Sequence, residues 1–303
     1  MLDLSEFITF VAEKSGVKKT KLVEQDILIH RILQEIYASP HLSANYLFKG
    51  GSCLVKGYFG YYRLSIDLDF TWRKQEVWAV GEKELRRKLH EEIKVFSRIL
   101  EEISKQVVLD FVNNPKNRRY FEFGGGGRMI TFKLWRGQEL VKIQVNFLEE
   151  LLFPSKHVKV KTLLDSVALS RDEKKYFEES LNLYRPIDVE AYDEREILCE
   201  KVRAILTRRV QKLRDLYDLF MLDAHGFKVE HFTNEIVRKI SASLYYKKYR
   251  NNLEANKKAM KFNMDILEDL FERELFVENP PQNFEGFLKG LLNPLKEIVN
   301  RLN

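Results

Sequence analysis

The chain of 303 residues and 36.0 kDa has a formal net charge of +6 and a sequence pI near 9.0, which allows one large domain or two ordinary ones and favours polyanionic partners. Charged residues interrupt every apolar segment before it reaches a membrane-spanning length, and the N-terminus has no signal-peptide pattern, so we expect a cytoplasmic protein without a membrane partner. The two cysteines, Cys53 and Cys199, and the six scattered histidines exclude a disulfide framework and a zinc-site spacing.

The first elements in the chain are predicted to be two helices and a short strand. Apolar residues at helical spacing cover Leu4–Lys14 and Leu22–Ala38, and the second helix is expected to end before Pro40. An apolar strand, Tyr46–Lys49, then leads into a helix that carries Cys53.

Gly50, Gly51 and Ser52 form the turn between this strand and the helix that follows. Glycines at such a turn allow backbone N–H groups and a hydroxyl to approach a phosphate closely. The turn therefore predicts a phosphate-binding site, with an ordinary tight turn as the alternative.

Strict alternation of apolar and polar residues from Leu64 to Phe70 predicts a half-buried strand. The apolar face is expected to hold Leu64, Ile66, Leu68 and Phe70, and the polar face Ser65, Asp67 and Asp69. Two carboxylates on one face repel each other unless a cation lies between them, so Asp67 and Asp69 predict a divalent cation site. Solvated aspartates of an edge strand are the alternative. Arg63 either contacts a phosphate or forms a salt bridge with an aspartate.

A long charged helix, Glu82–Val107, precedes three predicted strands. The strands are Tyr120–Phe123, Met129–Trp135 and Leu140–Phe147, and the four glycines 124–127 are expected to form a hairpin loop. A phosphate-binding turn followed by a carboxylate pair describes a nucleotidyltransferase palm, which normally carries a third carboxylate on its last strand. Here that polar face carries Lys142, Gln144 and Asn146, so one metal ion and two remain alternatives.

The main boundary is predicted near Pro186, where the composition changes. We expect a palm domain with N-terminal helices over residues 1–185 and a helical domain over residues 186–303 that closes the active-site cleft. The predicted helices are Asp193–Arg209, Gln211–Ala224, Glu230–Leu244, Leu253–Met264, Ile266–Phe276 and Phe284–Leu302. Residues 148–185 hold a basic tract and one charged helix but give no clear order of elements.

The first two of these helices carry a second group of candidate residues. Lys201 and Arg208 share a helical stripe suited to a triphosphate, and Asp215 and Asp218 share one face of the next helix. Such carboxylates bind a base, orient a lysine or accept a proton from an attacking hydroxyl. The alternatives are surface pairs of the cations with Glu200 and Glu196, and of the aspartates with neighbouring basic residues.

Four motifs in this order resemble the AbiEii/AbiGii toxin family, which includes the mycobacterial MenT toxins of the DNA polymerase β-type nucleotidyltransferase superfamily. They are Gly-Gly-Ser at 50–52, Arg-x-Ser-x-Asp-x-Asp at 63–69, Lys-x-x-Ala-x-x-x-Arg at 201–208 and Arg-Asp-x-Tyr-Asp at 214–218. The family motif has a lysine before the first aspartate of the last motif, and Arg214 keeps that charge here.

The resemblance implies an α+β fold, with a nucleotidyltransferase palm of mixed or antiparallel sheet flanked by helices and followed by a C-terminal helical bundle. It assigns Mg²⁺ to Asp67 and Asp69, and catalysis to these aspartates together with Lys201 and Asp215. The nucleotide contacts it implies are Gly50, Gly51, Ser52, Arg63, Ser65, Lys201, Arg208 and Asp218.

The expected activity is magnesium-dependent transfer of a nucleotide from a nucleoside triphosphate to an acceptor, RNA and in particular tRNA, by the toxin of a toxin–antitoxin pair. A cognate antitoxin is then the expected protein partner. Two alternatives stay open: a nucleotide- or RNA-binding module whose chemistry has lapsed, and a nucleotidyltransferase that acts on a protein acceptor.

Overall fold

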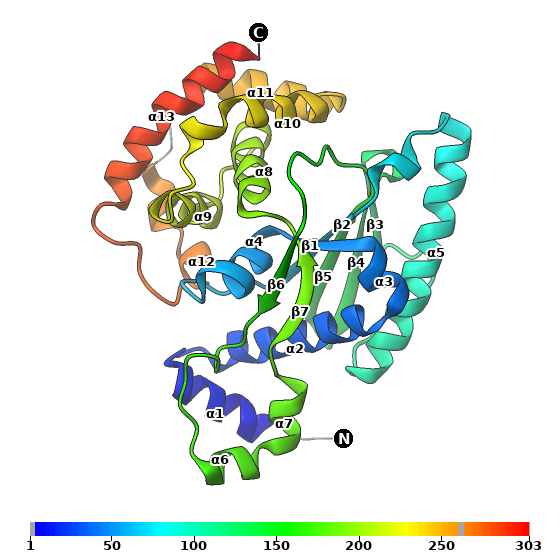
Figure 1. Cartoon of the computed structure of the whole chain (residues 1–303), viewed down its shortest axis with the longest axis vertical. Helices are drawn as coiled ribbons and strands as arrows, with labels where there is room; N and C mark the ends of the chain where they lie inside the picture. The colour runs from blue at the N-terminus through cyan, green and yellow to red at the C-terminus, as the bar shows by residue number, and fades with distance from the viewer. Residues whose placement is uncertain (1–3, 260–263, 303) are drawn as a thin grey trace. The chain divides into compact units, whose positions relative to one another are not determined.

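The computed structural model describes residues 4–259 and 264–302, and the chain divides into two compact units (Figure 1). Unit 1 consists of Met1–Glu149 and Ser155–Ala191, and unit 2 consists of Glu150–Pro154 and Tyr192–Asn303. Unit 1 holds a mixed sheet with flanking helices and unit 2 is helical, so the predicted α+β class is confirmed.

Unit 1 begins with three helices, which are followed by seven strands and four further helices. Its helices are α1 (Ser5–Ser15), α2 (Thr20–Ala38), α3 (Pro40–Asn45), α4 (Gly50–Cys53), α5 (Glu82–Gln106), α6 (Arg171–Tyr176) and α7 (Glu178–Leu183), with a π-helical turn η1 (Leu54–Phe59) directly after α4. Its strands are β1 (Tyr46–Lys49), β2 (Asp67–Trp72), β3 (Phe121–Gly124), β4 (Met129–Arg136), β5 (Glu139–Asn146), β6 (Lys156–Val160) and β7 (Ile187–Ala191). Short 3₁₀ turns cover Gln75–Trp78 and Gly125–Gly127, the second within the predicted hairpin loop.

The seven strands form one sheet in the order β3-β4-β5-β2-β1-β7-β6. At its centre β2 runs antiparallel to β1 and parallel to β5, with Asp69 opposite both Lys49 and Gln144. Because side chains directly opposite each other lie on the same face of a sheet, Lys49 and Gln144 share the face of Asp69. Phe48, Phe70 and Val145 are likewise opposite one another and share the other face.

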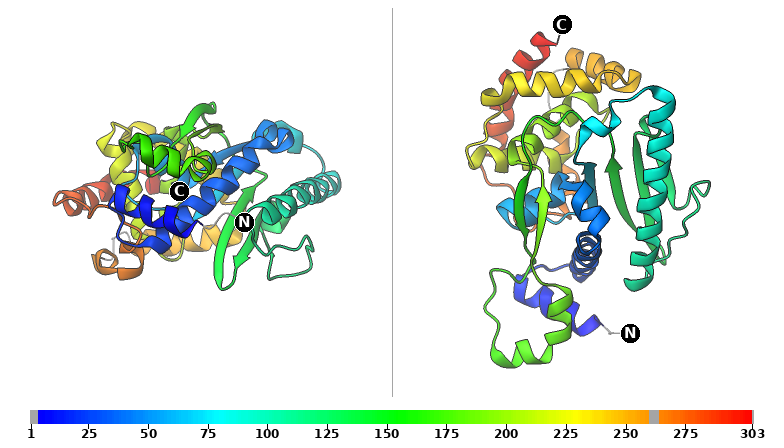
Figure 2. Two further views of the ribbon diagram at one scale, coloured as in Figure 1. Left: turned by 90° about the horizontal axis from the view of Figure 1, so that it is seen from below. Right: turned by 45° about the vertical axis from the view of Figure 1, so that its right-hand side comes forward.

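The apolar face of the sheet is covered by α2 and α5, which lie side by side (Figure 2). Tyr37 of α2 lies 6.5 Å from Phe70 between ring centroids, and Phe96 of α5 stacks on Phe132 of β4 at 4.9 Å. Packing on this side leaves the opposite face of β2 to polar side chains. The alternation predicted for Leu68–Phe70 is therefore confirmed, and it positions both aspartates on the polar face.

The structure corrects one expectation for unit 1 and adds two elements that the sequence analysis did not place. The strand begins at Asp67 and not at Leu64, and buried Leu64 packs into the cluster around α1, so it does not share the face of Phe70. The chain also resumes a helix at Pro40, which is well placed at a first helical position with Ser39 as its N-cap. The basic tract forms β6, in which Val158 and Val160 are buried while Lys159 between them is exposed.

Unit 2 is a set of helices with one short connecting segment from earlier in the chain. Its helices are α8 (Glu194–Thr207), α9 (Leu213–Ala224), α10 (Thr233–Ser243), α11 (Lys247–Ala259), α12 (Leu270–Arg273) and α13 (Phe284–Arg301), with 3₁₀ turns at Val229–Phe232 and Met264–Glu268. Across the described ranges, no helix combines the length and apolar character needed to cross a membrane.

The helix predicted over Leu253–Met264 starts earlier, at Lys247, and residues 260–263 of that prediction lie outside the described residues. The single helix predicted over Ile266–Phe276 is wrong, because this stretch forms a 3₁₀ turn and the short helix α12. Cys53 and Cys199 are both buried free thiols, consistent with the absence of a disulfide framework.

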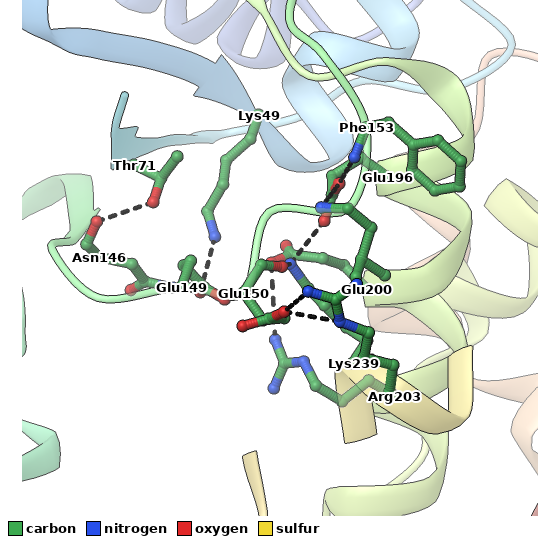
Figure 3. Close-up of polar contacts among 12 residues, drawn as sticks. Lys49, Thr71, Asn146, Glu149, Glu150, Phe153, Glu196, Glu200, Arg203 and Lys239 are labelled. Atoms are coloured by element: carbon green, nitrogen blue, oxygen red, sulfur yellow. Dashed lines mark hydrogen bonds and ion pairs between the residues drawn. The ribbon is translucent and has the colours of Figure 1, made fainter. Parts of the chain in front are cut away.

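The segment Glu150–Pro154 belongs to unit 2 through buried charged contacts, drawn in Figure 3. The carboxylate of Glu196 on α8 accepts hydrogen bonds from the backbone N–H groups of Leu152 and Phe153, at 2.7 and 2.9 Å. Lys239 of α10 donates to the carboxylate of Glu196 and to the backbone carbonyl of Glu150, both at 2.6 Å. The opposite charges of Lys239 and Glu196, together with these hydrogen bonds, compensate for the burial of both groups. The pair fixes the segment against α8 and α10.

Candidate active site

The turn after β1 brings its backbone against Asp69 of β2. Gly50 has φ of +76°, and a Cβ added there would overlap Oδ2 of Asp69. Both the left-handed conformation and the close approach require glycine at this position. The turn and the carboxylate are thus held in contact, as a site for phosphate and metal requires.

Gly51 has a similar relation to Arg63. The Arg63 side chain is only 1% exposed, its Nη1 donates to the carbonyl of Leu64 at 2.9 Å, and a Cβ on Gly51 would overlap its Nη2. The guanidinium therefore packs beneath the turn. It places a fixed positive charge next to the backbone that is predicted to receive a phosphate.

Ser52 links the turn to the start of β2. Its side chain is fully buried, and its Oγ lies 2.8 Å from Oγ of Ser65 and is hydrogen-bonded to the backbone carbonyl of Asp67. A hydroxyl has one proton to donate, so the short contact with Asp67 uses it. Within unit 1, Ser52 holds the beginning of the aspartate strand to the helix that follows the turn.

Asp67 and Asp69 are half-buried on the polar face of β2, where their neighbours on β5 are Lys142 and Gln144. The polar face next to the two aspartates therefore carries a lysine and an amide, as the alternation in β5 predicts. Within residues 4–259 and 264–302, no three His, Cys, Asp or Glu side chains are grouped closely enough to hold a metal ion.

The sequence analysis missed Lys49 and Glu149 as members of this face. Lys49 is 3% exposed, stands opposite Asp69 in the β1–β2 pair, and its Nζ lies 3.2 Å from Oε1 of Glu149 (Figure 3). Lysine is almost never buried to this degree without a specific charge partner. The sequence of β1 is a short apolar run without alternation, so the face of Lys49 follows only from its pairing with Asp69.

Asn146 completes this part of the face. Its Nδ2 donates to Oε1 of Glu149, and its buried Oδ1 has no hydrogen-bond partner within the described part of the chain. A buried carbonyl oxygen without a donor is rare in proteins. The face therefore presents one unsatisfied neutral oxygen in addition to the two carboxylates of β2.

These donors fit a magnesium ion that is bound together with a nucleotide. Mg²⁺ prefers hard oxygen ligands and is usually held by one or two carboxylates, with water and substrate phosphates completing its octahedron. Asp67 and Asp69 supply the two carboxylates from one face, and the contact of Asp69 with Gly50 sets them next to the turn. A third protein carboxylate is not required for such a site.

Unit 2 brings together the other four candidate residues. Nζ of Lys201 on α8 lies 2.6 Å from Oδ1 of Asp215 and 2.6 Å from Oδ2 of Asp218, both on α9. Nη1 of Arg208 forms an ion pair with Oδ2 of Asp215. The two aspartates do share one face of α9, as their i, i+3 spacing predicts.

The environment of this cluster determines the protonation state of Asp215. Burial acts to raise the pKa of Asp215, but the charges of Lys201 and Arg208 outweigh it and hold the pKa well below the usual range. Asp215 is therefore ionised at neutral pH and is a weak base. It is suited to orient a group by accepting a hydrogen bond, and poorly suited to remove a proton.

Two alternatives weighed for these residues are wrong. Glu196 pairs with Lys239 on α10, so it is no surface partner of the α8 cations. Arg214 lies 3.4 Å from Glu272, whereas Asp215 pairs with Lys201 and Arg208. Helix α8 also ends at Thr207, which places Arg208 at its C-cap with an extended backbone.

The residues predicted for the site therefore form one group in each unit: the glycine turn, Arg63, Ser65 and the β2 aspartates in unit 1, and the lysine, arginine and aspartate cluster in unit 2. A glycine turn in contact with one of two aspartates, on the polar face of a mixed sheet, is the arrangement expected of a nucleotidyltransferase palm.

A comparison with protein families agrees with this class. The family described as nucleotidyl transferase AbiEii toxin, type IV toxin–antitoxin system, matches residues 31–300. The chain belongs to this family and is a nucleotidyltransferase. The family implies a nucleoside triphosphate substrate and an antitoxin partner. None of the curated proteins matches the chain.

Proposed function

We propose that this nucleotidyltransferase uses Mg²⁺ to transfer a nucleotide from a nucleoside triphosphate to RNA, with tRNA as the expected acceptor. The proposal is supported above all by the contact between the Gly50 turn and Asp69, because it sets the turn that we expect to bind phosphate against a carboxylate that we expect to bind the metal. The net charge of +6 agrees with two polyanionic substrates.

In unit 1 the residues bind and orient the triphosphate. Backbone N–H groups of Gly51 and Ser52, at the start of the helical segment that continues into η1, would seat its oxygens. Asp67 and Asp69 would hold Mg²⁺, which supplies charge neutralisation at the phosphate oxygens when bound. The Ser52 hydroxyl keeps the aspartate strand in place, with Ser65 behind it.

In unit 2 the residues act on the leaving group and the acceptor. Transfer forms a bond between an acceptor hydroxyl oxygen and the α-phosphorus, and the bond to the β-phosphate bridging oxygen breaks to release pyrophosphate. Lys201 and Arg208 would neutralise the charge that develops on pyrophosphate. Asp215 would orient the acceptor hydroxyl, whose proton passes to water because the carboxylate is a weak base. Asp218 holds Lys201 in position and contributes to nucleotide binding.

The test is transfer of labelled nucleotide to bulk RNA. The full chain is incubated with total RNA and each labelled nucleoside triphosphate, with and without Mg²⁺. Asp67→Asn should lower incorporation by about 10²–10³-fold, and removal of Mg²⁺ should do the same. Asp172→Asn, at an exposed position of α6, is the matched control and should keep wild-type activity. Unchanged incorporation by the Asp67 variant would refute the metal assignment.

A toxin of this kind would act in the cytoplasm, where nucleoside triphosphates and tRNA are present. Expression of the chain alone should slow growth, whereas the Asp67→Asn variant at the same level should not. Normal growth with verified expression of the active enzyme would contradict the toxin role and leave the enzymatic proposal intact.

A further inference from the structure

Helix α11 and the residues just before it carry a concentration of basic and aromatic side chains that the proposed chemistry does not use. The sequence from Tyr245 is Tyr-Tyr-Lys-Lys-Tyr-Arg, and α11 itself contains five basic residues and one acidic residue, Glu254. The chain as a whole has a net charge of only +6. Helix α11, with five basic residues and one acidic residue, therefore carries a net charge of +4 by itself.

Four of the five cations of α11 are at exposed positions. Lys247, Lys248, Arg250 and Lys258 are exposed, and none of these four is ion-paired to a carboxylate among the described residues. The acidic residue of the helix, Glu254, is instead paired with Lys257 at 3.0 Å. Unpaired cations on one face are suited to a polyanion, since each phosphate they contact releases a counterion.

An aromatic side chain lies at the start of the same face. Tyr245 is 70% exposed, and its ring lies 5.6 Å from that of Tyr246, which in turn lies 5.7 Å from Tyr249. Tyr249 is turned inward, with the guanidinium of Arg203 over its ring at 5.8 Å. The three rings thus support one another and leave Tyr245 at the surface, where a ring can stack on an unpaired base.

The opposite face of α11 anchors it to α8, the helix that carries Lys201. Leu253 is buried, and the Nδ2 atoms of Asn252 and Asn256 donate to the carbonyls of Thr207 and Leu206 at the C-terminus of α8, at 2.9 and 2.8 Å. These bonds satisfy carbonyl groups that a helix end leaves without partners. Within unit 2, the basic helix is thereby fixed to the helix that holds the Lys201–Asp215 cluster.

We propose that the α11 surface, defined by Tyr245, Lys247, Lys248, Arg250 and Lys258, docks single-stranded RNA. The combination of unpaired cations with an exposed ring matches a flexible polyanion that offers both phosphates and unstacked bases. The choice of RNA as occupant rests on the proposed function, which supplies RNA as the acceptor. The surface would hold the acceptor strand while its end is extended.

The test is RNA binding by the full chain in EDTA without nucleotide, so that it does not depend on transfer. The probe is a fluorescein-labelled oligouridylate of about 12 nucleotides, a length within the usual range of single-strand sites. Substituting Lys247, Lys248 and Arg250 together with glutamate should weaken binding by about tenfold or more and reduce the salt slope by about 2, because single strands contribute about 0.7 per phosphate contact. Tyr245→Ala should weaken binding by about fivefold or more, and Tyr245→Phe should restore it.

Helix α6 offers a matched control, since Arg171, Lys174 and Lys175 are three exposed cations followed by Tyr176, which is also 70% exposed. Reversing these three charges changes the net charge equally and should alter RNA affinity by less than about twofold. Equal losses in the α6 and α11 variants would show a non-specific charge effect and overturn the proposal. Unchanged affinity in the α11 variant would also overturn it, in favour of an acidic protein at this surface.

The outcomes separate this proposal from the proposed function. If wild-type protein transfers no nucleotide but binds RNA through α11, the transfer proposal fails and the surface stands. If wild-type protein labels RNA and the α11 variant has unchanged RNA affinity and unchanged KM for RNA, the surface proposal fails and the function stands.

Discussion

Lys201 is expected to be indispensable for the stability of unit 2 as well as for activity. Its Nζ lies 2.6 Å from a carboxylate oxygen of each of two aspartates, and Asp215 and Asp218 are only 4% and 0% exposed. Lys201→Met keeps the length of the side chain and removes its charge, leaving Asp218 buried without its lysine. Removing one partner of a buried ion pair typically costs about 3–5 kcal/mol.

The assay is urea or thermal unfolding of the full chain followed by circular dichroism. At about 3–5 °C per kcal/mol for a domain of this size, the melting temperature of unit 2 should fall by about 10–20 °C. A second substitution, Asp218→Asn, should recover more than half of the loss because it removes the buried charge that Lys201 balances. Lys228→Met, at an exposed position of the same unit, should change stability by less than about 0.5 kcal/mol.

A loss below about 1 kcal/mol in the Lys201 variant would refute this reasoning. It would mean that the two carboxylates reach solvent or other partners once the lysine is gone. Failure of the Asp218→Asn substitution to recover stability would contradict the electrostatic origin of the loss in the same way.

Two further predictions follow from the geometry of the site. Gly50→Ala should lower the rate of nucleotide transfer about 100-fold, because the added Cβ displaces the Asp69 carboxylate. Gly16→Ala is the control: its φ is +72° and the space around it is open, so it should lower only the free energy of unfolding, by the backbone strain of about 1–2 kcal/mol. Equal transfer activity of the two variants would argue against the close approach of Gly50 to Asp69. Because the folded-state pKa of Asp215 is lowered from 3.8, its contribution to stability is present above that pH and is lost as the pH falls toward the folded value. The free energy of unfolding should therefore fall less steeply with decreasing pH in Asp215→Asn than in wild type. Equal slopes for the two proteins in an acid titration would contradict this.

The elements of the sheet could be predicted where the pattern is local. Strand β1 follows from a short apolar run and the faces of Asp67 and Asp69 follow from an alternation, and both patterns depend only on neighbouring residues. The predicted strand begins three residues before the observed one, because Leu64 packs in the cluster around α1 and not in the strand. Burial of an apolar residue alone does not say which core it joins.

Short strands with basic exposed positions could not be recognised with the same ease. In β6 only Val158 and Val160 are buried, and Lys156, His157 and Lys159 give the segment the composition of a solvated basic tract. Its assignment as a strand comes from pairing with β7, more than twenty residues further along the chain. Such pairing is a tertiary property that no local window contains.

The residues of the site likewise include some that local sequence patterns predict and some whose contacts depend on tertiary packing. The aspartate pair and the glycine turn were predicted from spacing, whereas Lys49 was missed because a lysine that ends a strand usually lies in solvent. The pairing of Lys201 with Asp215 and Asp218 depends on how α8 and α9 pack against each other. Spacing on one helix shows which residues share a face, but not which charge on another helix that face meets.

The central claim is that the groups from the two units act on one nucleotide. A crystal structure of the full chain with Mg²⁺ and a non-hydrolysable nucleoside triphosphate tests it most directly. We predict Asp67 and Asp69 on the metal ion, with Lys201 and Arg208 in contact with the phosphates of the same molecule. A bound nucleotide contacted by one group alone, with the other facing away from it, would contradict the proposed mechanism.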